Sequence, residues 1–76
     1  MIQVKLVLPT GRRNCTTTTT QTLRDFLEDE DVVFDGCTVS VNGMPCGVID
    51  FNATFEELGV TDTVVVAVVE KHNNAQ

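Results

Sequence analysis

The sequence predicts an α+β fold in which a mixed sheet of four or five strands packs against one main helix. Two observations carry this prediction. Residues 64–69 are six consecutive apolar residues, five of them valine, and a β-branched run favours a strand over a helix. Leu23, Phe26 and Leu27 are spaced as i, i+3 and i+4, which is the apolar stripe of a helix. We therefore expect the strand at 63–70 to lie at the centre of the sheet, with the helix covering one face.

The chain length indicates one small domain. At 76 residues the chain is near the lower limit for unaided folding, because a domain of this size buries only about 60% of its unfolded surface. We expect a single domain over residues 1–70 and a flexible polar tail over residues 71–76. No 18-residue apolar run is present, so we expect neither a signal peptide nor a membrane span.

Charge and cysteine content narrow the choice of compartment and partner. The net charge of −6 disfavours nucleic acid as a direct partner, because phosphate binding needs a basic face. We interpret Arg12 and Arg13 as a solvated hairpin end. An odd number of cysteines without an export signal favours reduced thiols and a cytoplasmic location; the three are Cys15, Cys37 and Cys46.

The first part of the chain reads as a hairpin. In the segment 2–8, one face has Ile2, Val4, Leu6 and Leu8 and the other has Gln3, Lys5 and Val7, the period of a half-buried strand. Leu8-Pro9-Thr10-Gly11 is typical of a type I turn, with proline at the second position and glycine at the fourth. The chain then returns through residues 12–15 into the threonine run 16–20, which we predict to be an edge strand because threonine favours strands.

The main helix is predicted to begin at Thr22. Thr22 can cap the helix, and Asp25 three residues later can complete the cap and favour the positive end of the helix dipole. The acidic run at 28–31 follows at the negative end, where each charge is unfavourable by roughly 0.3–1 kcal/mol at low salt. Two interpretations stay open: a solvated, frayed helix end, or an acidic docking site for a basic partner.

The second half alternates short strands and turns. Residues 32–34 are expected to close the core behind the helix. Residues 38–41 read as a strand that Asn42-Gly43 connects to a short edge strand at 44–46. Residues 54–59 repeat the capping-box pattern and predict one helical turn that ends at Gly59. The predicted core comprises Ile2, Val4, Leu6, Leu23, Phe26, Leu27, Val39, Val41, Phe55, Leu58, Val64, Val66 and Val68.

This order of elements resembles the β-grasp fold of ubiquitin-like proteins. Val4-Lys5 followed by Thr10-Gly11-Arg12 looks like the opening hairpin of ubiquitin. Val39-Ser40-Val41-Asn42-Gly43 and the segment 58–64, Leu-Gly-Val-Thr-Asp-Thr-Val, are similar to the late strands of the bacterial sulfur carriers of thiamine and molybdopterin synthesis. The resemblance implies a sheet in which the first and last strands lie parallel at the centre.

The last residues depart from the family pattern. Ubiquitin and the sulfur carriers end in a flexible Gly-Gly whose carboxylate is adenylated, and the lack of side chains lets it enter a narrow enzyme channel. This sequence ends Asn73-Asn74-Ala75-Gln76, and no glycine follows Gly59. Unless the chain is processed or truncated, we expect neither adenylation nor a thiocarboxylate at its terminus.

The sequence offers little catalytic chemistry. His72 lies in the predicted tail, where it would not be held rigidly beside a cysteine as a nucleophile pair requires. Three cysteines and His72 add up to four zinc ligands, but no Cys-x-x-Cys spacing is present. A capping role explains Glu57 better than acid–base catalysis with Glu56, and no Gly-rich phosphate loop occurs. We therefore predict no enzyme, no metal site and no cofactor.

A protein-interaction module is the function we favour, as a non-catalytic ubiquitin-like adaptor of a bacterium or a mobile element. Alternation along the last strand places Val65, Ala67 and Val69 on the sheet face away from the helix, with Val7 and Ser40 beside them. At position 40, ubiquitin-like domains that bind partners through this face often carry a large aliphatic residue. A contiguous apolar patch often marks a contact with another protein or a second copy, although scattered exposed aliphatics are also normal.

Two alternatives stay open beside the module. One is a sulfur-carrier-like or modifier protein, which the resemblance suggests and the missing Gly-Gly opposes. The other is a small acidic inhibitor or decoy of a basic nucleic-acid-binding protein, which the net charge suggests. An apolar contact through the sheet should survive raised salt, whereas the binding of an acidic decoy should weaken steeply.

Overall fold

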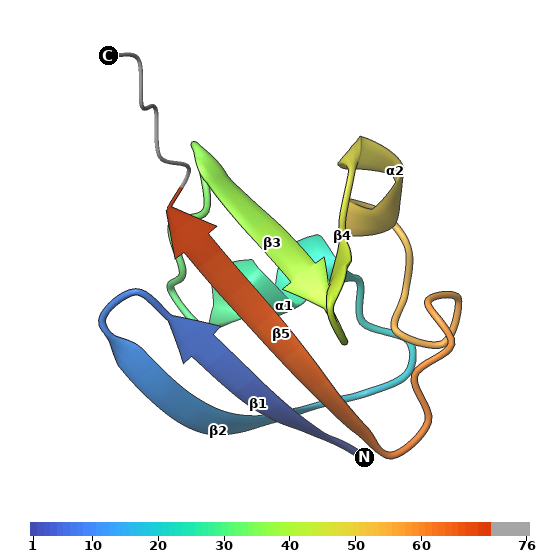
Figure 1. The fold of residues 1–76 in the computed structure, drawn as a ribbon. Coiled ribbons are helices and arrows are strands. Elements are labelled where there is room, and N and C mark those ends of the chain that lie inside the picture. The colour runs from blue at the N-terminus through green and yellow to red at the C-terminus, as the bar shows by residue number, and fades with distance from the viewer. Residues whose placement is uncertain (71–76) are drawn as a thin grey trace, which may run out of the picture.

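The computed structural model describes residues 1–70, so the predicted tail at 71–76 lies outside the described residues. One five-stranded sheet, in the order β2-β1-β5-β3-β4, has helix α1 packed on one face (Figure 1). The elements are β1 (Ile2–Leu8), β2 (Gly11–Thr17), α1 (Leu23–Asp29), β3 (Cys37–Val41), β4 (Met44–Pro45), α2 (Val48–Phe51) and β5 (Thr63–Glu70).

The valine-rich strand β5 is central, as predicted. It pairs in parallel with β1, where Val64 lies opposite Val4, and in antiparallel with β3, where Val66 lies opposite Val41. A parallel pair needs a long crossover, and residues 9–62 supply it with β2, α1, β3 and β4. The expected arrangement of first and last strands as parallel central neighbours is confirmed.

The opening hairpin is confirmed, but the threonine strand is shorter than predicted. Leu8 and Gly11 form the last pair of the β1–β2 ladder, and β2 ends at Thr17. The buried Thr17 hydroxyl donates a hydrogen bond to Gln21, and Gln21 N–H bonds to Thr18 O at 3.3 Å. The prediction of a strand through residue 20 is therefore wrong, because the chain must turn at 18–21 to reach the helix.

Helix α1 begins as its sequence indicates. The Thr22 hydroxyl accepts a hydrogen bond from Asp25 N–H at 3.1 Å, which satisfies one of the free N–H groups of the first turn. Leu23, Phe26 and Leu27 are all buried against the sheet. Phe26 meets Phe55 edge to face, with ring centroids 5.7 Å apart, so the helix and the loop before β5 share one core.

The predicted core is confirmed at every position except Leu58, which is only half-buried. Val60 takes the place that the sequence assigned to Leu58 and is 5% exposed. Gly59 adopts a φ of 85°, and Val60 N–H bonds back to Phe55 O at 2.9 Å, the pattern that closes a helical turn. This reversal turns Val60 inward. The expectation for residues 32–34 is wrong at Val33, which is 81% exposed in the loop after α1.

The β3–β4 hairpin and the segment after it are partly as predicted. Asn42 and Gly43 have φ values of 51° and 85°, the signature of a two-residue hairpin turn with positive φ at both positions. The capping box at 54–57 forms in both directions, at 3.1 and 2.9 Å. That segment remains a hydrogen-bonded turn, while the helix of this region is the unpredicted α2, in which Asp50 accepts a bond from Gly47 N–H at 2.9 Å.

Candidate functional site: the outer face of the sheet

The two faces of β5 differ sharply in exposure. Val64, Val66 and Val68 are at most 2% exposed beneath α1, whereas Val65 is 41% and Val69 is 56% exposed. This is the alternation expected of a strand with one covered face. α1 lies behind the sheet in Figure 1, so the face toward the viewer is the one that no described element covers.

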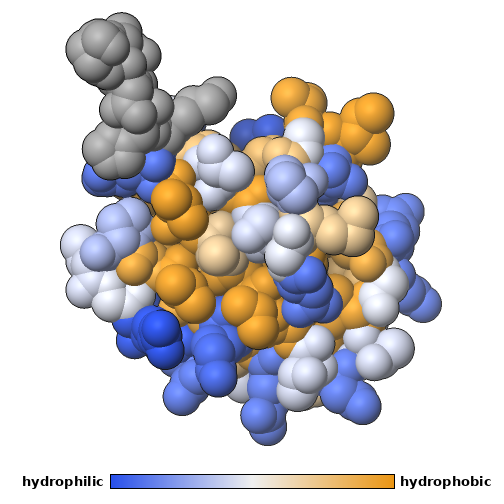
Figure 2. Space-filling model, in the orientation of Figure 1, coloured by the Kyte–Doolittle hydropathy of each residue, from blue (hydrophilic) through white to orange (hydrophobic). Residues whose placement is uncertain are grey.

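The strand register brings the five predicted partner-binding residues together. Ala67 on β5 lies opposite Val7 on β1 and opposite Ser40 on β3, so these three form a row across the sheet. Val65 and Val69 lie on β5 two residues before and two residues after Ala67, on the same face of the sheet. We call this set the docking face: Val7, Ser40, Val65, Ala67 and Val69. Figure 2 shows apolar side chains gathered in a band over this side of the molecule.

Basic residues flank the docking face on the β1–β2 side. Lys5 lies opposite Val65 on β5 and opposite Asn14 on β2. Arg12 lies opposite Val7, and both basic side chains are exposed. From the sequence we interpreted Arg12 as a solvated hairpin end. The register shows that it also lies next to Val7 of the docking face. The alternation of Lys5 with Val7 along the first strand was the signal that could have placed Lys5 beside the patch.

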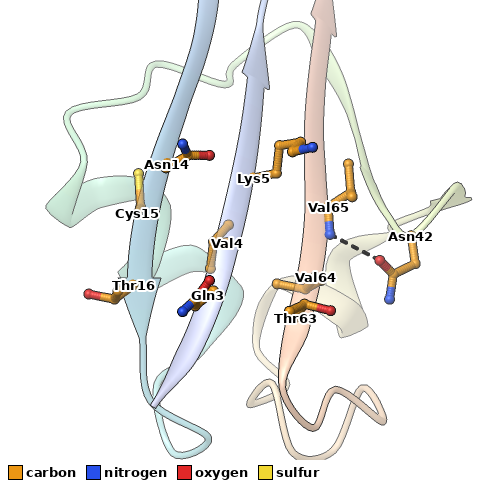
Figure 3. A pocket seen from close by; sticks show the side chains of 10 residues that line it. All are labelled: Gln3, Val4, Lys5, Asn14, Cys15, Thr16, Asn42, Thr63, Val64 and Val65. Carbon is orange, nitrogen blue, oxygen red and sulfur yellow. Dashed lines mark hydrogen bonds between the residues drawn. The ribbon is translucent and has the colours of Figure 1, made fainter.

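An open hollow adjoins the docking face. It has a volume of about 490 Å³, and its lining includes Gln3, Lys5, Asn14, Thr63 and Val65 (Figure 3). At its edge, the side-chain oxygen of Asn42 accepts a hydrogen bond from Val65 N–H at 3.0 Å. This bond joins the β3–β4 turn to β5 at the edge of the hollow.

A second group of exposed apolar side chains was not predicted. Met44 on β4 is 72% exposed, and Val48 and Ile49 on α2 are 74% and 85% exposed. None of the α2 side chains is buried. Phe51 at the end of α2 instead stacks on Phe34, with centroids 5.2 Å apart. No periodic pattern in the sequence marks this group, because the four residues of α2 are too few to show one.

The acidic end of α1 is partly neutralised within the chain. An Arg13 guanidinium nitrogen donates to the Glu30 backbone carbonyl at 3.0 Å, and another lies 3.9 Å from the Glu30 carboxylate. Gln21 donates to Asp29 at 2.6 Å. Two of the four carboxylates at 28–31 therefore already have partners, and one of them, Glu30, has its charge offset by a cation.

The Cys15 thiol contacts Glu30 of the same ion pair. Its sulfur is 3.3 Å from a Glu30 carboxylate oxygen, to which it donates a hydrogen bond. Burial raises the pKa of Cys15 above its ordinary value, the hydrogen bond and negative charge of Glu30 raise it further, and Arg13 opposes them. Burial, followed by the charge of Asp50, also raises the pKa of Cys46. A raised pKa lowers the fraction of thiolate, the form that reacts, at both positions.

We expect Cys15 in the native protein to react slowly with a thiol reagent at neutral pH and faster as the pH rises. The reagent attacks the thiolate, and the raised pKa of Cys15 keeps the thiolate fraction low until the pH is high. The same shift adds to the free energy of unfolding below the ordinary thiol pKa, and this contribution is lost as the pH rises through the raised pKa. Glu30→Gln removes the negative charge and should accelerate labelling of Cys15. Mass spectrometry of the Cys15 peptide gives the rate.

The control for this experiment is Glu28→Gln, which removes the same charge from an exposed position in the last turn of α1, the helix that Glu30 caps. It should leave the Cys15 rate close to that of the unmodified sequence. Equal rates in Glu30→Gln and Glu28→Gln would contradict the assigned role of Glu30.

Other chemistry has little support in the described residues. Within residues 1–70, no group of three or more His, Cys, Asp or Glu side chains is arranged to hold a metal ion, and His72 lies outside this range. Glu57 accepts its bond from Thr54 N–H in the capping box, as the sequence predicts. In the same range, no helix has the length and apolar character needed to cross a membrane.

The fold is shared with solved ubiquitin-like proteins. No family model and no curated protein matches the chain. The structure is similar to a ubiquitin-like protein from Trypanosoma brucei, with a TM-score of 0.74, 23% identity, and 93% of this chain and 95% of that one covered.

It is also similar to the ubiquitin-like domain of an Arabidopsis thaliana protein (TM-score 0.73, 16% identity, 99% and 82% covered). A third similar structure is a ubiquitin-like protein from the archaeon Caldiarchaeum subterraneum (TM-score 0.58, 15% identity, 96% and 100% covered). With the parallel pairing of β1 and β5, these likenesses show that the chain has the β-grasp fold of ubiquitin-like proteins.

Proposed function

We propose that this chain is a protein-interaction module that binds its partner through the docking face. The observation that carries the proposal is the row formed by Val7, Ala67 and Ser40 across three strands, extended along β5 by two valines that are 41% and 56% exposed. Contiguous exposed apolar surface on a small protein is typical of a contact site. The occupant is another protein or a second copy of this chain.

The shape of the face supports a protein partner. The docking face lies on three paired strands, so its side chains are presented at fixed spacings, and little conformational entropy is lost on binding. On β3, the residue opposite Ala67 is Ser40, which has no large aliphatic side chain. Apolar contact is therefore strongest along β5, at Val65 and Val69, and these two positions should dominate the binding energy.

The two alternatives have less support from the described residues. A carrier or modifier would act through a terminal carboxylate, and no observation on residues 1–70 supports that chemistry. A decoy for a basic nucleic-acid-binding protein would use the acidic end of α1, where Glu30 and Asp29 are already engaged by Arg13 and Gln21. A basic partner would first have to break these internal contacts, whereas a partner of the docking face would not.

Val69→Lys tests the proposal. The added charge should weaken partner capture by about tenfold or more, because a lysine in an apolar contact must be desolvated without a partner. Quantitative affinity capture from the cell that encodes the chain, combined with sedimentation of the purified protein, measures both kinds of occupant. Val65→Lys should act in the same direction.

Matched controls come from the same substitution elsewhere. Val33→Lys and Val48→Lys add the same charge at exposed valines, one in the loop after α1 and one on α2, and both should leave capture and oligomeric state unchanged. Unchanged behaviour of Val69→Lys, or a loss confined to Val48→Lys, would contradict the proposal and move the site to the α2 surface.

A further inference from the structure

The outer face of the sheet carries cations and no carboxylate at its ladder positions, although the chain is acidic overall. The sequence has eleven acidic and five basic residues. The ladder positions that share the outer face nevertheless include two charged residues, Lys5 and Arg12, and no carboxylate. The acidic residues of 25–31 lie on and after α1, behind the sheet. The surface beside the docking face is thus locally basic on a chain that is acidic overall.

Both cations are available to a partner. Within residues 1–70, the one ion pair joins Arg13 to Glu30, so neither Lys5 nor Arg12 has an acidic partner within 4.0 Å. A second open hollow, of about 230 Å³, is lined by Lys5, Arg12, Arg13 and Asn14. It shares Lys5 and Asn14 with the larger hollow beside Val65. No carboxylate lines either hollow, so a carboxylate placed there would meet cations and neutral side chains and no like charge.

Local charge, rather than net charge, decides what this face accepts on contact. At physiological salt the screening length is roughly 8 Å, so the carboxylates behind the sheet are largely screened from a partner on its front. A basic partner would place like charges beside Lys5 and Arg12, which is strongly unfavourable at an interface. An acidic partner would pair with both cations while its apolar side chains cover β5.

We infer that the partner segment of the docking face is acidic and aliphatic, with carboxylates over Lys5 and Arg12 and aliphatic side chains against Val65, Ala67 and Val69. This inference rests on the proposed function, and it names the chemistry of the partner. It also differs from the decoy alternative in the charge of the partner: a decoy would bind a basic protein through the acidic side of the molecule.

Two synthetic amphipathic peptides provide the test. They have identical leucine faces, and their flanking positions are all glutamate in one peptide and all lysine in the other. Each is titrated into the ¹⁵N-labelled full chain at physiological salt, and amide shifts are followed by NMR. We expect the glutamate peptide to bind about tenfold or more tightly than the lysine peptide, with the largest shifts at Lys5, Arg12, Val65 and Ala67.

Charge-reversed variants sharpen the result. Lys5→Glu and Arg12→Glu should each reduce the preference for the glutamate peptide, and the double variant should reverse it. Arg24→Glu is the control, because it changes the net charge equally from α1, where Arg24 lies over the Phe51 ring at 5.9 Å, on the other side of the sheet. It should leave the preference unchanged.

The outcomes separate the two claims. Equal affinity for both peptides, or tighter binding of the lysine peptide, with shifts on the docking face would overturn the acidic-partner inference and leave the docking face as the binding site. Shifts confined to Met44, Val48 and Ile49, or no shifts on the docking face with either peptide, would overturn both the inference and the proposed function.

Discussion

Phe26→Ala is expected to lower the free energy of unfolding by about 3–5 kcal/mol, because it empties a large cavity in the core. Phe26 is 1% exposed and projects from α1 onto the ring of Phe55, which is itself fully buried. The substitution removes both the apolar burial and the edge-to-face contact. Small proteins are stable by about 5–15 kcal/mol in total, so the loss should leave the variant marginally folded or unfolded.

Urea unfolding followed by circular dichroism measures this effect, and Phe51→Ala is its control. Phe51 is half-buried and stacks on Phe34 at the edge of the core. The same truncation there should cost less, on the order of 1 kcal/mol, because part of the ring already contacts water. If the two variants lost equal stability, the assignment of Phe26 to the centre of the core would be wrong.

Much of the fold could be predicted because several local signals agree with the global arrangement. The valine run at 64–69 required a central strand, and the stripe that includes Leu23 and Phe26 required a helix over it. Asn42-Gly43 required a tight hairpin, since both residues adopt positive φ. These signals depend on β-branched side chains, on the helical period and on backbone sterics. All three act between residues close in sequence, so a single sequence is enough to detect them.

The errors fall where local pattern is weak. The uniform threonine run could not mark the end of β2, because Thr17 and Thr18 have the same strand preference although one is paired and the other begins a turn. Leu58 and Val60 lie on either side of Gly59, and the turn geometry, rather than their apolar character, decides which one is buried. Such positions depend on tertiary contacts.

The candidate site was predictable in its apolar part and not in its charged part. Alternation alone placed Val65, Ala67 and Val69 on the outer face. Lys5 and Arg12 lie far from these valines in the sequence, and they become neighbours of the docking face only through the register of β1 with β2 and β5. A net charge of −6 concealed the local excess of positive charge.

Val65→Lys and Val66→Lys are expected to lower the free energy of unfolding by very different amounts, although the two residues are adjacent. Val66 is fully buried between Leu6 on β1 and Val41 on β3. A lysine there would place an unpaired charge in the core, at a cost of about 3–5 kcal/mol or more. We expect Val66→Lys to be unfolded or nearly so at room temperature.

Val65→Lys should remain folded, because its side chain projects into solvent from the outer face. Its cost should stay below about 1 kcal/mol and arise from the like charge of Lys5 on the neighbouring strand. Thermal and urea unfolding of both variants give the comparison. Comparable destabilisation of the two would show that β5 is covered on both faces, and the docking face would then not be open to a partner. A folded Val65→Lys beside an unfolded Val66→Lys would show that loss of binding in Val65→Lys reports on the surface rather than on the fold.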